Sequence, residues 1–393
     1  MAKTIRVGLV GTGFAGEFHV ESLRRVYGVD VEIAGVTSRR AASREAFGRK
    51  HGIRVFDSVE AMMPAIDLLD VSSPPYAHET QILAAARAGK HIICEKPLTG
   101  CFGSGDPELF FGNRAPKEPM YREVLERLRR ISEAVTAAGV SFGYAENFVY
   151  APGIQKEREI LEKTGAQILR MTGEESHNGS ASGVYGIWSQ AGGGSLIGKG
   201  CHPLGAILYL KRVEGLVRDG KPIRPATVSA RTHEITRLPG YRDEGAIRTD
   251  YRDIEDYGVM HITFGDGTVA DVLTGEIVLG GIYDYVEIFA NNHRTRANLS
   301  PAGLMDVYNP REETFKDIYL MEKISTKSGW TPAAPSEAFT MGYQGELQDF
   351  VTAAAANVQP QSELGLACDT TATIYAAYCS AERKGVETEI ELI

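Results

Sequence analysis

The feature that most constrains this chain is a glycine-rich hexapeptide at residues 11–16, which has the sequence GTGFAG. An apolar run of branched residues precedes it and a helical pattern follows it. In this strand–turn–helix setting Gly11 permits the tight turn, Gly13 lets a pyrophosphate approach the backbone, and Gly16 lets helix and strand pack closely. The hexapeptide predicts a dinucleotide site, against the alternative of a glycine turn without a ligand. Its predicted contact residues are Gly11, Thr12, Gly13, Phe14, Ala15 and Gly16.

Around this hexapeptide, apolar strands alternate with helices over the first 145 residues. That order is typical of an α/β domain whose parallel sheet is covered by helices on both faces. The expected strands are Ile5–Val10, Val31–Thr37, Ile66–Ser72, His91–Cys94 and Val140–Tyr144, and the expected helices are Phe14–Val26, Ala41–His51, His78–Ala88 and Tyr121–Gly139. Residues 1–145 are therefore predicted to form a Rossmann domain.

From residue 146 to residue 393 the pattern changes to a run of strands flanked by helices. This order favours an α+β domain with a largely antiparallel sheet. The expected strands are Val228–His233, Tyr257–Phe264, Val269–Val278 and Tyr285–Ala290, and the expected helices are Ile154–Lys163, His202–Lys211, Gly345–Ala356 and Leu366–Arg383.

Residues 99–120 interrupt the first domain. They hold four glycines, three prolines and the pair Phe110-Phe111, without periodicity. A long loop in a compact domain is usually functional or disordered. We expect a lid or wall over the substrate pocket with both phenylalanines packing inward, so that its deletion raises the substrate KM and leaves NADP affinity nearly unchanged.

The end of the second strand bears on cofactor choice. An NAD-binding domain typically places Asp or Glu there to hold the ribose 2′-hydroxyl, whereas this chain has Thr37-Ser38-Arg39-Arg40. Ser38 and Arg39 could bind a 2′-phosphate that a carboxylate would repel. The residues thus favour NADP over NAD. Alternatively, the arginines are solvated, or Arg39 stacks on the adenine of either cofactor.

Two further residues suggest chemistry. Lys96, in Glu95-Lys96-Pro97, follows the fourth strand, and ligands of open parallel sheets bind beyond the carboxyl ends of strands. Its ammonium could stabilise a developing alkoxide. His202, after the Gly192–Gly194 segment, could shuttle a proton, although a lone histidine is more often structural.

The formal net charge of −9, without a basic block, argues against nucleic-acid binding. No signal-peptide pattern or membrane-spanning apolar run is found, and the five scattered cysteines are typical of reduced thiols, so a cytoplasmic location is expected. His91, His177 and His202 are too dispersed to indicate a metal site, and no metal is predicted.

The ordered combination of motifs resembles the Gfo/Idh/MocA oxidoreductase family over nearly the whole chain. The resemblance is carried by GTGFAG at 11–16, Ser73–His78, Ala88–His91, Glu95-Lys96-Pro97, Asn147, Tyr150–Pro152, the segment from Gly192 to His202, Glu346–Phe350 and Ser380–Glu382. It implies a C-terminal substrate-binding domain with a large, mostly antiparallel, open-faced sheet that mediates homodimers or homotetramers. It also implies a sugar, cyclitol or related polyol or ketose as substrate.

By this resemblance Lys96 is the active-site lysine and His202 the proton-transfer histidine. The turn that contains Ser73, Pro74 and His78 would line the cofactor together with Glu95. Asn147 would lie near the substrate. Polar and aromatic residues also gather near it in sequence, as sugar sites require. The predicted substrate-binding residues are Glu146, Asn147, Tyr150, His177, Trp188 and His202, with Tyr185 in the same group.

One departure from the family pattern concerns the acids around His202. The family usually has an Asp four residues before the histidine and often an acid three residues after it, but this chain has Gly198 and Gly205. Either another residue replaces the missing carboxylate, with Glu146, Glu175 and His177 as the candidates and none of the three preferred, or the chemistry differs. The altered motif keeps open a glycoside-cleaving enzyme with tightly bound NAD, which acts by transient oxidation and elimination. A non-catalytic dinucleotide sensor is a further alternative.

Overall fold

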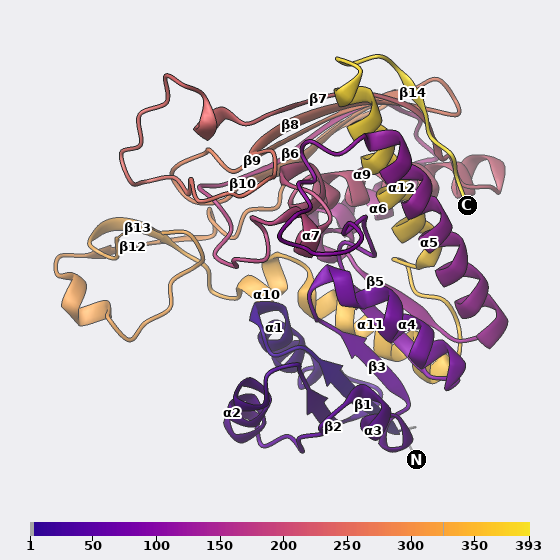
Figure 1. Cartoon of the computed structure of the whole chain (residues 1–393), viewed down its shortest axis with the longest axis vertical. Coiled ribbons are helices and arrows are strands. Elements are labelled where there is room, and N and C mark those ends of the chain that lie inside the picture. The colour runs from indigo at the N-terminus through magenta and orange to yellow at the C-terminus, as the bar shows by residue number, and fades with distance from the viewer. Residues whose placement is uncertain (1–3, 325) are drawn as a thin grey trace.

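The glycine hexapeptide lies in the predicted setting, between strand β1 (Thr4–Val10) and helix α1 (Phe14–Leu23) (Figure 1). The structure is a computed structural model that describes residues 4–324 and 326–393, so the first three residues of the predicted domain lie outside it. β1 pairs in parallel with β2 (Asp30–Thr37) and with β3 (Leu68–Val71). The turn therefore opens at the carboxyl edge of a parallel sheet.

This first sheet has the strand order β2-β1-β3-β4-β5, with β4 at His91–Glu95 and β5 at Phe142–Ala145. All of its pairs are parallel, as the Rossmann prediction requires. The accompanying helices are α2 (Ala41–His51), α3 (Val59–Met62), α4 (His78–Arg87) and α5 (Lys117–Ala138).

Helix α5 corrects one predicted boundary. It was expected from Tyr121, but it begins at Lys117, so the last four residues of the predicted 99–120 loop are helical. Pro119 sits in the first turn, where a proline breaks no intrahelical hydrogen bond. The irregular segment therefore ends at Pro116.

The second sheet has the order β11-β10-β6-β9-β8-β7-β14 and is mostly antiparallel, as predicted; β6 and β9 form its parallel pair. Its strands are β6 (Ile168–Ser176), β7 (Pro225–His233), β8 (Tyr257–Phe264), β9 (Val269–Gly275), β10 (Tyr283–Ala290), β11 (Arg294–Asn298) and β14 (Thr388–Glu389). Strand β6 was not predicted, because Arg170, Glu174 and Glu175 disguise its apolar alternation.

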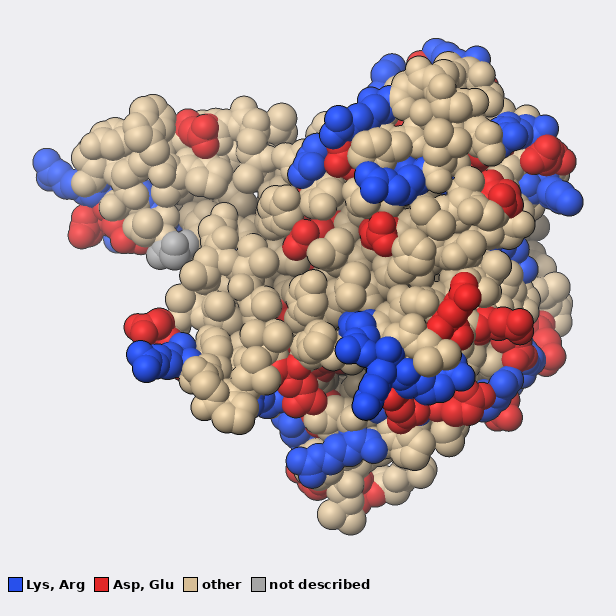
Figure 2. All heavy atoms as spheres, turned by 90° about the horizontal axis from the view of Figure 1, so that it is seen from above, with Lys and Arg blue, Asp and Glu red and all other residues tan. Residues whose placement is uncertain are grey.

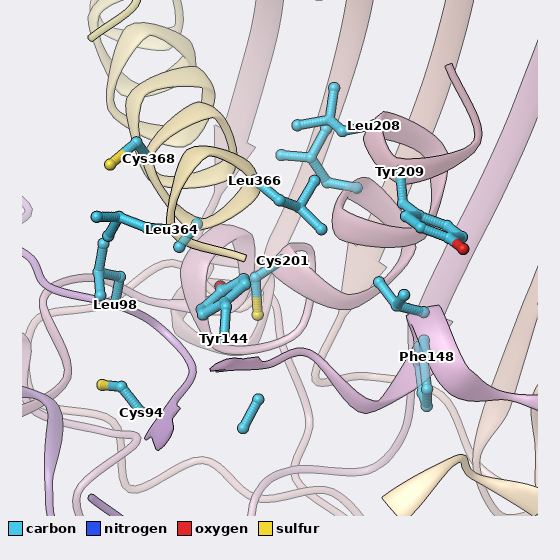
Figure 3. Close-up of a cluster of buried hydrophobic side chains, with 14 of the residues drawn as sticks. Cys94, Leu98, Tyr144, Phe148, Cys201, Leu208, Tyr209, Leu364, Leu366 and Cys368 are labelled. Carbon is cyan, nitrogen blue, oxygen red and sulfur yellow. The ribbon is translucent and has the colours of Figure 1, made fainter. Parts of the chain in front are cut away.

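Helices α6 (Pro152–Thr164), α9 (Cys201–Asp219) and α12 (Leu364–Glu382) lie below this sheet in Figure 1, and the opposite face carries no helix there. Apolar side chains from both halves of the chain meet beneath the sheet. Figure 3 shows Leu98 and Tyr144 from the first domain beside Cys201, Leu364 and Leu366. This core fixes the end of β4 relative to the start of α9.

Helix α11 (Tyr343–Ala356), near the chain's end, returns to the first domain, where it contacts α1, β1 and β5. Phe350 occupies the space beside Gly143, where a Cβ would approach the phenyl ring to 2.6 Å. The remaining short elements are α7 (Trp188–Ala191), α8 (Ser195–Gly198) and α10 (Glu337–Thr340), with β12 (Met305–Asn309) and β13 (Gly329–Ala333) in an arm that projects from the body (Figure 1). Among the described helices, none combines the length and apolar character needed to cross a bilayer.

Candidate active site

The glycine turn has the geometry that a dinucleotide pyrophosphate needs. Gly11 has φ +124°, and a Cβ there would lie 2.2 Å from the carbonyl oxygen of Ser72. A Cβ on Gly16 would lie 3.0 Å from the carbonyl oxygen of Gly11. By contrast, a Cβ on Gly13 would meet nothing within 4 Å, so open space faces the start of α1. The residues present therefore fit a bound phosphate group at this helix N-terminus.

The end of β2 places Ser38 and Arg39 beside the turn. The Thr12 hydroxyl lies 3.4 Å from the Ser38 hydroxyl, and the exposed Arg39 guanidinium donates to the Tyr76 hydroxyl at 3.1 Å. The two predicted phosphate-binding side chains are thus accessible at the edge expected for the adenosine half of the cofactor.

His78 holds two neighbouring turns together. Its Nδ1 lies 2.9 Å from the Pro97 carbonyl oxygen and its Nε2 lies 2.7 Å from that of Ser73. Burial lowers the pKa of His78, although both carbonyl contacts act to raise it. Its position explains how the 73–78 turn and the Lys96-Pro97 turn keep a fixed separation.

A buried group of side chains lies behind Lys96 and consists of Asp70, His19 and Glu95. Only Glu95 was predicted from the sequence as a site residue. His19 Nδ1 lies 2.9 Å from the Asp70 carboxylate, and its Nε2 lies 3.2 Å from Glu95 Oε1. Burial acts to lower the pKa of His19, but the two carboxylates raise it well above its ordinary value. Glu95 Oε2 accepts from the Lys96 backbone N–H at 3.0 Å. We name this group the paired wall.

Lys96 follows β4 and points toward the start of α9. Its Nζ donates to the Gly198 carbonyl oxygen at 3.1 Å and lies 5.5 Å from the centre of the Tyr185 ring. Burial acts to lower the pKa of Lys96, but nearby acidic groups, Tyr185 foremost, raise it well above its ordinary value. The side chain is therefore an ammonium aimed between the two halves of the chain.

His202, in the first turn of α9, is paired with Glu146. Its Nδ1 lies 2.6 Å from Glu146 Oε1. Burial lowers the pKa of His202 well below its ordinary value and raises that of Glu146 well above. These shifts favour an uncharged pair in which the protonated Glu146 carboxyl donates to Nδ1, and the His202 Nε2–H is left to donate to another partner.

The two acids missing from the family pattern have spatial replacements. A Cβ on Gly205 would lie 2.6 Å from Cγ of Glu146, so the Glu146 side chain fills the place of an acid at that position. A Cβ on Gly198 would lie 3.3 Å from Cδ1 of Tyr185, so the tyrosine ring stands at the other position. Glu146 was one of the expected replacements. Tyr185 was not, because no local signal links it to a glycine thirteen residues later.

A third group of side chains lies on strands β6 and β10. Glu175 and Asp284 are opposite each other in the antiparallel register, and both point to the face that α9 covers. His202 Nε2 lies 3.8 Å from Glu175 Oε2. Burial raises the pKa of Glu175 to about 7 and raises that of Asp284 well above its ordinary value. We name Glu175, Asp284 and Glu146 the open wall.

The other predicted substrate residues form hydrogen bonds with neighbouring parts of the fold. Asn147 donates to the Met341 carbonyl oxygen at 2.7 Å, and the Tyr150 hydroxyl donates to Asp349 at 2.7 Å. His177 accepts from the Gly179 N–H at 3.1 Å, and burial lowers its pKa. Trp188 is 1% exposed and donates to the Cys101 carbonyl oxygen. Among the described residues, none of the four is hydrogen-bonded to Lys96 or His202, but His177 lies close enough to both for their charges to interact.

The segment from Thr99 to Pro116 packs against the second domain. Gly112 donates to Asp253 at 2.8 Å, and a Cβ there would clash with the Trp188 ring. Phe110 packs on the core as predicted, whereas Phe111 lies half-buried between the guanidinium groups of Arg114 and Arg252. These contacts anchor the segment, and its predicted role as a lid stays a prediction.

One group of possible metal ligands overlaps the site. The ligand atoms of Glu146, Cys201 and His202 lie within 4.8 Å of one another. However, the Glu146–His202 separation is that of a hydrogen bond, and burial raises the pKa of the Cys201 thiol well above its ordinary value. Because zinc binds thiolates, this group is better described as a hydrogen-bonded pair beside a neutral thiol.

Comparison with known proteins decides the family of the first domain. Residues 5–104 match the model of the Gfo/Idh/MocA oxidoreductase family, NAD-binding Rossmann fold. By this match, residues 5–104 form the NAD-binding Rossmann domain of the Gfo/Idh/MocA oxidoreductase family, and the resemblance drawn from the sequence is confirmed for this domain.

Among the relatives, inositol 2-dehydrogenase of Cereibacter sphaeroides is 40% identical over 104 residues, which cover 26% of this chain and 31% of that enzyme. Inositol 2-dehydrogenase of Paracoccus denitrificans is 30% identical over 174 residues, or 42% of this chain and 44% of that enzyme. The matches thus span less than half of either relative.

Solved structures match the whole fold. GenD2 from gentamicin A biosynthesis, in complex with NAD, superposes with a TM-score of 0.77 at 21% identity, covering 100% of this chain and 97% of that one. Levoglucosan dehydrogenase, in complex with NADH and levoglucosan, gives a TM-score of 0.71 at 18% identity and covers 100% of both chains. The chain therefore shares its two-domain fold with these two proteins.

Proposed function

We propose that this protein is an NAD(P)-dependent oxidoreductase that interconverts a CH–OH group and a carbonyl group on a sugar, cyclitol or related polyol. The observation that carries the proposal is the convergence of Lys96 and His202 beside the carboxyl edge of the glycine-turn sheet. The relatives named inositol 2-dehydrogenase and the structural neighbour with levoglucosan support this substrate class. The bound nicotinamide would supply hydride acceptance or donation.

The residues of this chain then orient the substrate and move its proton. The Lys96 ammonium donates a hydrogen bond to the reacting oxygen and stabilises the negative charge that grows on it. In carbonyl reduction His202 donates its Nε2 proton to the reacting oxygen while Glu146 returns a proton to Nδ1, and alcohol oxidation reverses both transfers. The pair therefore passes between no net charge and one negative charge, and the nearby Lys96 ammonium offsets that charge.

An assay of cofactor reduction with a panel of inositols and sugars tests this proposal. We expect turnover by the native chain and a loss of about a hundredfold or more in kcat for Lys96→Ala, with dinucleotide affinity unchanged. Turnover without net cofactor consumption would indicate the glycoside-cleaving alternative. Tight cofactor binding without turnover of any panel member would indicate the sensor.

We further propose NADP as the preferred cofactor, with NAD as the alternative. The accessible Ser38 hydroxyl and Arg39 guanidinium support this preference, because both can donate to a 2′-phosphate. The family model and the neighbours that contain NAD or NADH favour the alternative. Titration with both cofactors tests the preference, and Arg39→Asp should shift the affinity ratio toward NAD by about tenfold or more.

We also propose that copies of the chain associate as a homodimer or homotetramer through the open face of the seven-stranded sheet. Val259 and Leu273 are paired on neighbouring strands at outward positions, and Tyr283 is 46% exposed. Figure 2, seen from above this sheet, shows few charged side chains over its middle. Light scattering after size-exclusion chromatography should give a dimer or tetramer, and Leu273→Asp should yield a monomer.

A further inference from the structure

Several buried carboxylate oxygens of the open wall have no hydrogen-bond partner within residues 4–324 and 326–393. They are both oxygens of Asp284, Oε2 of Glu175 and Oε2 of Glu146. Asp284 is 2% exposed, Glu175 8% and Glu146 0%. A buried polar atom without a partner costs about 1–3 kcal/mol, and more when it is charged. The folded chain alone therefore leaves this wall incomplete.

The register of the sheet adds repulsion between like charges to this arrangement. Asp284 and Glu175 are directly opposite across strands β10 and β6, where side chains approach most closely and like charges repel. Both strands alternate so that these acids share the face covered by α9. Gly173 confirms the orientation of that face, because a Cβ there would lie 2.9 Å from Pro203 of α9. The two acids thus stand together beside His202.

The cations nearby are already engaged elsewhere. Lys199 pairs with Glu276 and donates to the Ser180 hydroxyl at 3.0 Å, while Lys96 donates to Gly198. In the described ranges 4–324 and 326–393, no Lys or Arg lies within ion-pair distance of Asp284 or Glu175. Their neighbour His202 is neutral, since burial and the nearby lysines lower its pKa. Because burial raises the pKa of both acids, a positively charged donor is the partner that would let them ionise inside the site.

We propose that the open wall binds an ammonium group of the substrate, so that the substrate class is an amino sugar or aminocyclitol. This inference rests on the proposed oxidoreductase function, because it places the amine beside the hydroxyl that Lys96 and His202 contact. An ammonium brings three N–H donors and one positive charge, whereas each hydroxyl of a neutral polyol brings one donor and no charge. The ammonium therefore satisfies several carboxylate oxygens and offsets the repulsion between Asp284 and Glu175.

The test compares matched pairs that differ in one amino group: glucosamine with glucose, galactosamine with galactose, and scyllo-inosamine with scyllo-inositol. We measure kcat/KM by cofactor reduction, and binding by calorimetry with cofactor-loaded protein at neutral pH. For at least one pair, we expect the amine to exceed its hydroxyl partner by about tenfold or more, equivalent to about 1.4 kcal/mol.

Two variants make the comparison specific. Asp284→Asn should reduce the amine-to-hydroxyl ratio by about tenfold, because it removes a charge that the ammonium contacts. Asp271→Asn is the matched control: its carboxylate lies on the same sheet but contacts His261 on the half-exposed face, and it should keep the native ratio.

The outcomes separate the two proposals. Turnover of hydroxyl partners with equal or weaker use of every amine overturns the ammonium site and leaves the oxidoreductase standing. Amine binding that depends on Asp284 without any turnover supports the ammonium site and contradicts the oxidoreductase. Absence of binding by every pair overturns the ammonium site, as does a rise in Tm with magnesium or calcium that Asp284→Asn abolishes.

Discussion

The paired wall and the open wall are both built from buried acids, but only one of them contains its own cation. Asp70 and Glu95 lie on either side of the His19 imidazole. Glu175 and Asp284 face each other, and the part of the chain that the structure describes offers them no Lys or Arg at ion-pair distance. The first arrangement is complete without a ligand and can fix the backbone of Lys96. The second needs a partner from outside, which is a property of a binding surface rather than of a scaffold.

Removing the cation of the paired wall should have the largest effect. His19→Ala leaves Asp70 and Glu95 buried without their shared partner, and loss of one member of a buried ion pair typically costs about 3–5 kcal/mol. Urea unfolding should therefore show a large loss in the free energy of unfolding.

The matched control is His261→Ala, whose imidazole forms an exposed pair with Asp271. Exposed pairs contribute about 0–1 kcal/mol, so this variant should unfold almost like the native chain. Equal losses in the two variants would show that His19 does not stabilise the paired wall.

Breaking the pair between His202 and Glu146 should affect rate rather than stability of the fold. Glu146→Gln keeps the size of the side chain but cannot hold the proton beside Nδ1, and general acid–base steps typically contribute about a hundredfold or more in rate. Initial rates at saturating concentrations of a substrate without an amino group should show a kcat loss of this order.

A double variant provides the check on this pairing. If Glu146 acts through His202, then His202→Asn and the combination with Glu146→Gln should lose nearly the same kcat. Independent, multiplying losses would mean that Glu146 does not position the histidine.

The open wall should make the protein less stable as pH rises. The pKa of Glu175 is raised from 4.5 to about 7 in the folded chain, so the folded state holds a proton that the unfolded state releases. Stability from this group is complete below pH 4.5, falls between 4.5 and 7, and stays lost above 7. The loss is about 3 kcal/mol by the conversion of pKa shifts to free energy.

Asp284→Asn should soften that pH dependence. Burial and the opposing Glu175 raise the pKa of Asp284 well above its ordinary value, so Asp284 also costs stability as pH rises, and replacing it with Asn should gain about 1–2 kcal/mol in unfolding free energy at neutral pH. Unfolding curves at acidic and neutral pH measure both slopes. A variant that is less stable than the native chain at neutral pH would contradict the view that the open wall is incomplete.

Tyr185 should give the smallest effect. Its ring stands beside Gly198 and Lys96, so it shapes the site without holding a proton in the proposed reaction. We expect Tyr185→Phe to raise the substrate KM about two- to fivefold, as loss of one hydrogen bond would, and to leave kcat nearly unchanged. A loss of kcat as large as that of Glu146→Gln would make Tyr185 a proton donor instead.

The two walls also differ in how well the sequence predicts them. The end of β4 and the glycine turn carry local signals, because each motif is continuous and adjoins a strand. The open wall assembles residues far apart in the chain. Asp284 lies just outside the predicted strand Tyr285–Ala290, and Glu175 lies in β6, which was not predicted. Their alignment depends on β-sheet register, which no local pattern specifies.

The missing acids illustrate the same limit. Gly198 and Gly205 are visible as departures in the sequence, but the side chains that fill their places come from distant segments. Glu146 could be predicted as a candidate replacement for a missing acid, since it follows a strand end in the first domain. Its role beside His202 depends on how α9 packs against that strand, which is a tertiary property.

A crystal structure of the cofactor-loaded protein with the best-bound amine from the matched pairs tests the site most directly. We expect the reacting hydroxyl at hydrogen-bond distance from Lys96 Nζ and His202 Nε2, with the substrate nitrogen between the Asp284 and Glu175 carboxylates. A substrate nitrogen turned away from both acids, or Lys199 released from Glu276 to pair with Asp284, would contradict the ammonium site.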